Sequence, residues 1–167
     1  MEQKIYYDIL HLEGNEIYIS ATDKGLCYVG SPEEGYEDMA KRFPAAVFEK
    51  SPEALKPYRD ELTEYLEGEL VEFSLPTDVK GTPFQEAIWG ALREIPYGET
   101  CTYSDIAEKI GKPAAVRAVG TAIGGNPVLM TVPCHRVIGK NGAITGYRGG
   151  IAMKEHLLEL EKAHFRG

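Results

Sequence analysis

Cysteine is the residue type in this sequence with the greatest capacity for covalent chemistry, and the chain has three: Cys27, Cys101 and Cys134. Their number is odd, and no two of them have the C-x-x-C spacing of a redox or metal motif. A thiol reacts as the thiolate, and its ordinary pKa of about 8.5 leaves most of it protonated at neutral pH. We therefore expect free thiols, of which at least one can react when a neighbouring group takes its proton.

Cys134 lies in the run Pro-Cys-His-Arg at residues 133–136, where a base follows the thiol directly. Residues 128–132 are apolar and predict a short strand, on which neighbouring side chains point to opposite faces. Contact between the thiol and His135 therefore needs a bridging water or a bend at the proline. A carboxylate behind the imidazole would complete a relay of the Ser-His-Asp type. The last predicted helix offers three candidates: Glu155, Glu159 and Glu161. The alternative is that Cys134 is a small buried hydrophobe.

Charge is distributed unevenly along the chain. Residues 1–80 hold 8 Lys or Arg against 18 Asp or Glu, whereas residues 81–150 hold 7 against 5. The small positive excess allows a DNA-binding surface on the C-terminal half, with few phosphate contacts and a shallow salt dependence. The N-terminus has no basic region followed by an apolar run, and no stretch approaches the roughly 18 apolar residues of a membrane span. We expect a soluble, cytoplasmic protein without membrane contact.

Hydrophobic periodicity predicts a small α/β subdomain over residues 1–76. Runs rich in β-branched and aromatic residues, separated by turn signals, predict an antiparallel meander. These runs are residues 4–10, 16–20 and 25–29. Helical spacing follows at 34–42 and 52–68, the second with Ser51 as N-cap and Pro52 at the first helical position. Alternation at 71–75 predicts one more strand.

Residues 81–167 are predicted to form a mostly helical domain. Thr82 and Gln85 form a capping box at the start of its first helix. Thr102 or Ser104 caps a short helix, and residues 114–123 form another across a tight turn, which suggests a winged-helix-like helix-turn-helix. A glycine-rich loop at 145–150 precedes a final helix at 151–162. The predicted fold class is α+β, with the sheet in the N-terminal subdomain and the helix-turn-helix in the C-terminal domain.

Motifs spread over residues 80–162 resemble the O6-alkylguanine-DNA alkyltransferases, and this region is half of the chain. The most specific is the Pro-Cys-His-Arg-Val run at 133–137, preceded at fixed spacing by Asn126-Pro127. Other motifs follow the order and spacing of that family: Phe84-Gln85, Trp89, residues 95–98 (Ile-Pro-Tyr-Gly), Thr102-Tyr103, residues 117–120 (Arg-Ala-Val-Gly), Gly146-Tyr147 and Gly149-Gly150. The N-terminal half is only broadly similar.

The resemblance implies catalytic roles residue by residue. Cys134 would accept the alkyl group, and His135 would act as its base through a water. Glu161 would orient the histidine, which singles it out from the three carboxylates. Asn126 would tie its turn to the active-site strand, and Tyr103 would help rotate the nucleotide and contact the base.

The resemblance also implies contacts with DNA. Arg117 matches the finger that enters the duplex and fills the space left by the flipped base. The small Ala118 and Gly120 would let this helix approach the minor groove closely, and Arg136 is also expected at the DNA surface. The guanine would be surrounded by three residues, of which the first two lie in the closing loop: Tyr147, Arg148 and Val137.

The implied reaction is direct-reversal repair of O6-alkylguanine, and of O4-alkylthymine, in double-stranded DNA by a monomer. The lesion must be flipped out of the stack at a cost of a few kcal/mol, which an intercalating Arg117 partly offsets. The thiolate attacks the alkyl carbon, and Tyr103 donates to the leaving guanine. The thioether product is stable, so each molecule acts once. We expect no cofactor and no metal, because His11 and Cys27 are too few for a structural zinc.

Three alternatives are distinguished by simple observations. A lesion-binding protein of the same fold would bind methylated DNA without gaining mass. A cysteine hydrolase using Cys134 and His135 needs an oxyanion hole and would turn over many times. A transcription regulator would bind a specific operator, but it leaves the run at 133–136 unexplained.

Overall fold

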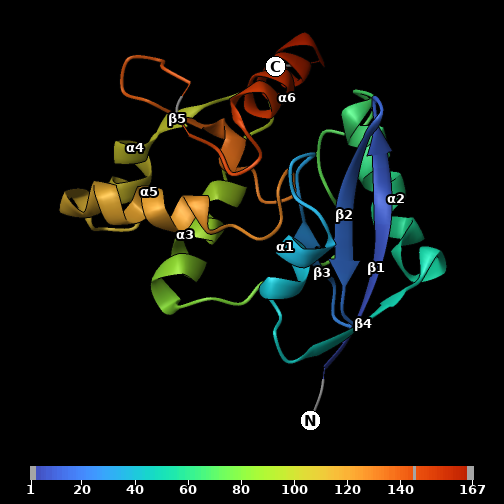
Figure 1. Cartoon of the computed structure of the whole chain (residues 1–167). Coiled ribbons are helices and arrows are strands. Elements are labelled where there is room, and N and C mark those ends of the chain that lie inside the picture. Colours follow the sequence, from blue (N-terminus) through green and yellow to red (C-terminus); the bar gives the residue numbers. More distant parts are fainter. Residues whose placement is uncertain (1–2, 145, 165–167) are drawn as a thin grey trace. The chain divides into compact units, whose positions relative to one another are not determined.

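The computed structural model describes residues 3–144 and 146–164, which form two compact units (Figure 1). The first unit comprises the chain up to Val79 together with Pro127–Leu129, and the second comprises the remaining residues. A sheet dominates the first unit and helices dominate the second, which confirms the predicted α+β class. No helix in the described part of the chain is both long enough and apolar enough to cross a membrane.

The sheet of the first unit contains the predicted meander and one strand that the sequence analysis missed. Strands β1 (Gln3–Leu12), β2 (Asn15–Ala21) and β3 (Leu26–Val29) pair antiparallel in succession. Strand β4 (Ala46–Lys50) adds to the free edge of β1 in parallel, which gives the order β3-β2-β1-β4. The sheet is therefore mixed: the predicted antiparallel meander forms, and the parallel strand β4 was not predicted.

Two helices of the first unit match the prediction. These are α1 (Tyr36–Lys41) and α2 (Pro52–Leu66). The Ser51 hydroxyl accepts a hydrogen bond from the Ala54 N–H at 3.2 Å and caps α2 as expected. Helix α2 contacts β1 and β2, and its apolar face buries Leu55, Leu62 and Tyr65.

The strand predicted at 71–75 does not form. The backbone N–H groups of Ser74 and Leu75 donate to the Glu61 carboxylate on α2 at 3.1–3.2 Å. Phe73 places its ring 5.1 Å from that of Tyr65, centroid to centroid. The Phe73 ring and the Glu61 carboxylate therefore anchor an irregular segment to α2, and the backbone donors that a sheet would use are taken by a side chain.

The second unit is built from short elements around the thiol. In chain order they are α3 (Pro83–Arg93), β5 (Cys101–Thr102), α4 (Tyr103–Lys109), the 3-10 turn η1 (Pro113–Ala115), α5 (Val116–Gly124), the 3-10 turn η2 (Cys134–Arg136), β6 (Val137–Ile138) and α6 (Ile151–His164). The capping box at Thr82 forms as predicted, and Thr102 rather than Ser104 caps α4. Helices α4 and α5 contact each other across η1, as a helix-turn-helix requires.

The apolar run at 128–132 is not the predicted strand. Val128 makes an isolated bridge with Val29, and the chain then turns through Met130, whose φ is +68°. Burial rather than pairing along a strand accounts for the apolar run, since four of its residues are buried: Val128, Leu129, Met130 and Val132. The consequence for the site is direct: Cys134 opens a 3-10 turn instead of ending a strand.

Candidate active site

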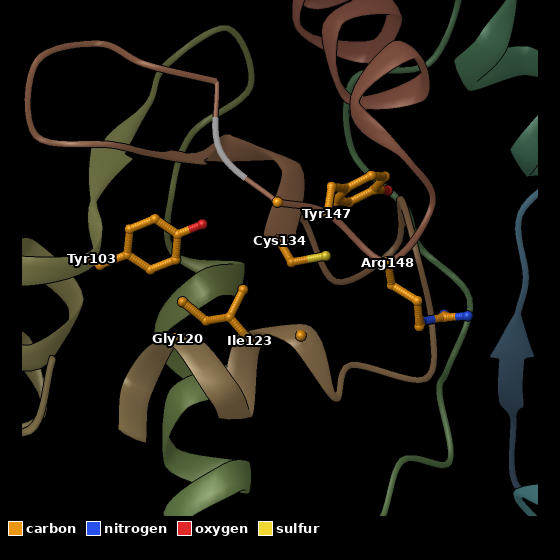
Figure 2. A pocket seen from close by; sticks show the side chains of 8 residues that line it. Tyr103, Gly120, Ile123, Cys134, Tyr147 and Arg148 are labelled. Carbon is orange, nitrogen blue, oxygen red and sulfur yellow. The ribbon is translucent and has the colours of Figure 1, made fainter. Parts of the chain in front are cut away.

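Cys134 lies in the wall of a cavity of about 480 Å³ in the second unit (Figure 2). Tyr103 contributes from the start of α4, and Gly120 contributes from α5. Tyr147 and Arg148 contribute from the loop before α6. A cavity of this size falls within the range of small-molecule sites. In the view of Figure 2, Cys134 lies between Tyr103 on one side and Tyr147 with Arg148 on the other.

Gly120 lines the cavity next to Tyr103, and its lack of a side chain leaves the space beside that ring open. A Cβ built there would lie 3.8 Å from the Tyr103 ring. That is ordinary van der Waals contact, so a side chain larger than methyl would enter the space beside the ring. Tyr103 and Gly120 are expected from the sequence to contact the base and the DNA, and the structure brings both to the cavity that Cys134 lines.

Asn126 holds the thiol from behind. Its side chain is fully buried, and Nδ2 donates to the Val132 carbonyl at 2.9 Å and to Cys134 Sγ at 3.3 Å. Burial raises the pKa of the Cys134 thiol, whereas the Asn126 hydrogen bond and then the charges of Arg148 and Lys154 lower it. Arg148 also joins the loop to this turn, because its Nε donates to the Asn126 carbonyl at 3.1 Å.

His135 and Glu161 form a buried pair. His135 Nε2 lies 2.6 Å from Glu161 Oε2, and the two side chains are 0% and 1% exposed. Because a carboxylate can only accept, Nε2 carries the proton and the neutral ring has its lone pair on Nδ1. Burial lowers the pKa of His135, and the hydrogen bond and charge of Glu161 raise it. Glu155 and Glu159, the other two candidates, are exposed.

The structure corrects the assignment of Arg136 to the DNA surface. Arg136 is 7% exposed, and its Nε and Nη2 donate to the two oxygens of Glu161 at 2.8 and 3.0 Å. Nη1 donates to the Ile95 carbonyl at 2.6 Å. A guanidinium held by a carboxylate and a carbonyl inside the protein cannot also reach a phosphate.

Val137 also lies elsewhere than expected. It is fully buried in β6, opposite Cys101 of β5, and it is not among the described residues that line the cavity. Its side chain therefore packs in the core behind the site. The sequence could not separate this role from substrate contact, because both favour an apolar residue after the reactive turn.

The outer face of α5 carries the residues expected at DNA. Arg117 and Ala118 are exposed, whereas Val119, Ala122 and Ile123 are buried on the opposite face. The indole of Trp89 donates to the Ala122 carbonyl at 2.9 Å and fixes α5 to α3. Of the small residues of α5, Ala118 is therefore exposed, whereas Ala122 is packed against the rest of the domain.

Lys154 is a site residue that the sequence analysis missed. It is only 1% exposed and precedes Glu161 by two turns, so α6 presents both residues on one face. Burial lowers the pKa of Lys154, and the nearby Cys134 raises it. The sequence contained a signal for its burial, because Lys154 lies on the apolar face of α6 with Met153 and Leu157. A lysine normally indicates a face exposed to solvent, so this signal was not used.

A metal site has no support among residues 3–144 and 146–164, where no three His, Cys, Asp or Glu side chains are grouped to hold an ion. The chemistry available here is that of a thiol at a cavity wall, with an imidazole and carboxylate buried beside it. These features define a cysteine-nucleophile protein that carries a helix-turn-helix.

Comparison with known proteins identifies the family. Residues 83–163 match the 6-O-methylguanine DNA methyltransferase DNA-binding domain, and residues 5–79 match the ribonuclease-like domain of the same proteins. The inducible methylated-DNA–protein-cysteine methyltransferase of Bacillus subtilis (strain 168) is 56% identical over 162 residues, which are 95% of this chain and 90% of that protein.

Solved structures give the same result. The O6-methylguanine methyltransferase of Mycobacterium tuberculosis has a TM-score of 0.85 at 41% identity, covering 96% of this chain and 94% of that chain. The Mycobacterium tuberculosis OGT in complex with DNA has a TM-score of 0.85 at 40% identity, covering 95% and 94%. The chain belongs to the 6-O-methylguanine DNA methyltransferase family.

Proposed function

We propose that the protein repairs DNA by moving an alkyl group from O6 of guanine, or O4 of thymine, onto Sγ of Cys134. The observation that carries this proposal is the position of Sγ in the wall of the cavity, held by Asn126 and opposite Tyr103. The predicted C-terminal domain, residues 81–167, holds both the DNA-binding and the acceptor residues. The protein acts as a cytoplasmic monomer on double-stranded DNA.

The lesion must leave the duplex before the thiol can reach it, because O6 of a paired guanine lies inside the base stack. Arg117 enters from the minor groove and occupies the vacated position, and Ala118 beside it permits close approach. The exposed face of α5 and the cavity share the same helix, since Gly120 lies one turn from Arg117. The flipped base then lies between Tyr103 and the loop of Tyr147.

Proton transfer prepares the sulfur. The Cys134 proton passes through a water to Nδ1 of His135, whose Nε2 is held by Glu161. Asn126 and Lys154 stabilise the thiolate in its buried position. The thiolate forms a C–S bond as the C–O6 bond breaks, and the guanine takes up the negative charge. The Tyr103 hydroxyl donates to that oxygen, and the thioether remains on Cys134.

The alternative is a protein that binds the lesion without transfer. The site residues argue against it, because such a protein does not need the Cys134 thiol or a base, His135, to deprotonate it. Mass measurement distinguishes the two. Incubation with an excess of O6-methylguanine duplex should add one methyl group, about 14 Da, because CH₃ replaces the thiol proton. An unchanged mass would indicate a binder, and repair of more than one lesion per protein molecule would indicate turnover.

Arg117 provides a separate test of base flipping. Arg117→Ala should slow repair of a lesion in duplex DNA but leave transfer from the free O6-methylguanine base at its original rate, since a free base needs no flipping. Lys112→Ala, at an exposed position before η1, is the control for loss of a positive charge. Equal losses on the two substrates would argue against a finger role for Arg117.

A further inference from the structure

The Glu161 carboxylate accepts hydrogen bonds on both oxygens from His135, Arg136 and Gly98, more than a histidine-orienting carboxylate needs. Oε1 accepts from Arg136 Nε at 2.8 Å and from the Gly98 N–H at 3.2 Å. Oε2 accepts from His135 Nε2 at 2.6 Å and from Arg136 Nη2 at 3.0 Å. A guanidinium therefore binds both oxygens in the forked geometry of strong Arg–carboxylate pairs.

Arg136 is itself fixed in place. Its Nη1 donates to the Ile95 carbonyl at 2.6 Å, and its Cζ lies 5.7 Å from the centre of the Tyr97 ring. The chain segment that follows α3 thus supplies a carbonyl, an aromatic face and the Gly98 N–H to one buried ion pair. These groups surround Glu161, whereas proton transfer from Cys134 to His135 requires only the bond between Glu161 and His135 Nε2.

The guanidinium changes the charge that His135 experiences. An isolated buried carboxylate would favour the imidazolium form of a histidine bonded to it. Here the carboxylate charge is balanced by Arg136, and Lys154 adds a second positive charge from α6. Glu161 raises the pKa of His135, whereas burial, Arg136 and Lys154 all lower it. Tyr97, on the remaining side, has its own pKa raised by burial and by Glu161.

We propose that Arg136 is a positioning residue that keeps His135 a neutral base, by occupying the carboxylate that would otherwise hold the histidine in its protonated form. This inference rests on the proposed function, in which His135 must accept the Cys134 proton. With Arg136 in place, Glu161 still fixes the tautomer and leaves the lone pair on Nδ1. The imidazolium formed when the thiol proton arrives is disfavoured, so His135 readily passes that proton on through the bridging water once the alkyl group has moved. The proton neutralises the charge left on guanine, since Sγ is then a thioether.

The test compares three variants of the full-length protein. Arg136→Met removes the charge and should raise the pKa of His135. The acid limb of the pH–rate profile for methyl transfer should then move to higher pH by roughly one unit. Arg136→Lys keeps a positive charge and should leave the acid limb near its original position. The double variant Arg136→Met/Glu161→Gln removes both charges, avoids an unpaired buried carboxylate, and should bring the limb back toward the wild-type position.

Two readouts separate this inference from the proposed function. The transfer rate to an O6-methylguanine duplex is measured by mass from pH 5.5 to 9, and the His135 imidazole is titrated by NMR in protein with labelled histidine. Arg93→Met, at an exposed arginine of α3, controls for the loss of one positive charge. The NMR titration applies even if the wild type transfers no methyl group, in which case the proposed function fails alone.

An NMR titration of His135 that is the same in Arg136→Met as in the wild type would overturn the role of Arg136. A loss of rate that is equal at every pH and is not restored by the second substitution would do the same, because it would mean that Arg136 only supports the fold. Should Arg136→Met fail to fold, Arg136→Gln takes its place, because glutamine can donate to Glu161 without carrying a charge; the same shift of the acid limb is expected, and an unshifted limb would overturn the role of Arg136.

Discussion

Cys27 in the first unit and Cys134 in the second are buried to nearly the same degree, at 2% and 3% exposure, yet their surroundings differ in charge. Burial has the largest effect on both and raises the pKa of each thiol, that of Cys27 to about 11. Cys27 shares a hydrogen bond with Ser20 at 3.3 Å, and the charge near it is Asp78, which raises its pKa further. The charges near Cys134 are Arg148 and Lys154, which lower its pKa.

The comparison teaches that burial alone does not decide what a cysteine does. Desolvation opposes the thiolate at both positions. At Cys27 the Ser20 hydrogen bond lowers the pKa, but the nearby charge of Asp78 raises it. At Cys134 an amide donor and two positive charges all lower the pKa, and that thiol also faces a cavity. At Cys101, burial and then Asp105 raise the pKa to about 11, although Lys109 lowers it in part.

The largest expected effect is the loss of the acceptor itself. Cys134→Ala should abolish methyl transfer while keeping DNA binding, because the side chain is buried and the expected DNA contacts come from the exposed Arg117 and Ala118. Cys27→Ala should keep the wild-type transfer rate and lower the free energy of unfolding by about 1 kcal/mol. Mass after exposure to O6-methylguanine duplex and fluorescence anisotropy on DNA are the measurements. Transfer by Cys134→Ala at the wild-type rate would refute the claim that Cys134, and not Cys27, is the acceptor.

The next effect concerns the donor to the sulfur. Asn126→Ala removes the hydrogen bond to Sγ and the bond to the Val132 carbonyl that shapes the turn. The single-turnover transfer rate should fall by about 100-fold, as for removal of one donor to a developing anion. Asn141→Ala, at an exposed turn position, is the matched control and should keep the rate. An unaffected rate in Asn126→Ala would mean that the thiolate does not need its donor.

The smallest of these effects concerns the buried lysine. Lys154→Met removes a positive charge that lowers the pKa of Cys134, so the thiolate requires a higher pH to form. The transfer rate at pH 7 should fall by about tenfold, equivalent to a shift of one unit in pKa, and should recover as the pH rises. Lys162→Met, at an exposed position on α6, should leave the pH profile unchanged. A loss that does not diminish with rising pH would show that Lys154 acts through the fold alone.

The sequence predicts the locally determined parts of this molecule well. The caps at Ser51, Thr82 and Thr102 form because each is decided within four residues. The meander of β1, β2 and β3 follows from alternation and turns. Strand β4 escaped prediction because its pairing partner is distant in the chain, so five residues between two helices gave too little pattern.

The site was predictable in its residues but not in its geometry. The resemblance identified Cys134, His135 and Glu161, but the apolar run before them indicated a strand, and the structure has a turn with a left-handed residue at Met130. Arg136 was assigned to DNA and Lys154 was not considered, because positively charged side chains usually lie at the surface. Both are buried here because α6 brings a carboxylate and a lysine to one side of the reactive turn, which only tertiary structure reveals.

The most direct test of the central claim locates the transferred methyl group among the three thiols of the wild-type protein. Peptide mapping over a time course with O6-methylguanine duplex should place all of it on Cys134, at one per molecule, with Cys27 and Cys101 unmodified throughout. Methylation of Cys27 or Cys101 at a comparable rate would contradict the claim that the neighbours of Cys134, and not burial or thiol chemistry in general, make it the acceptor.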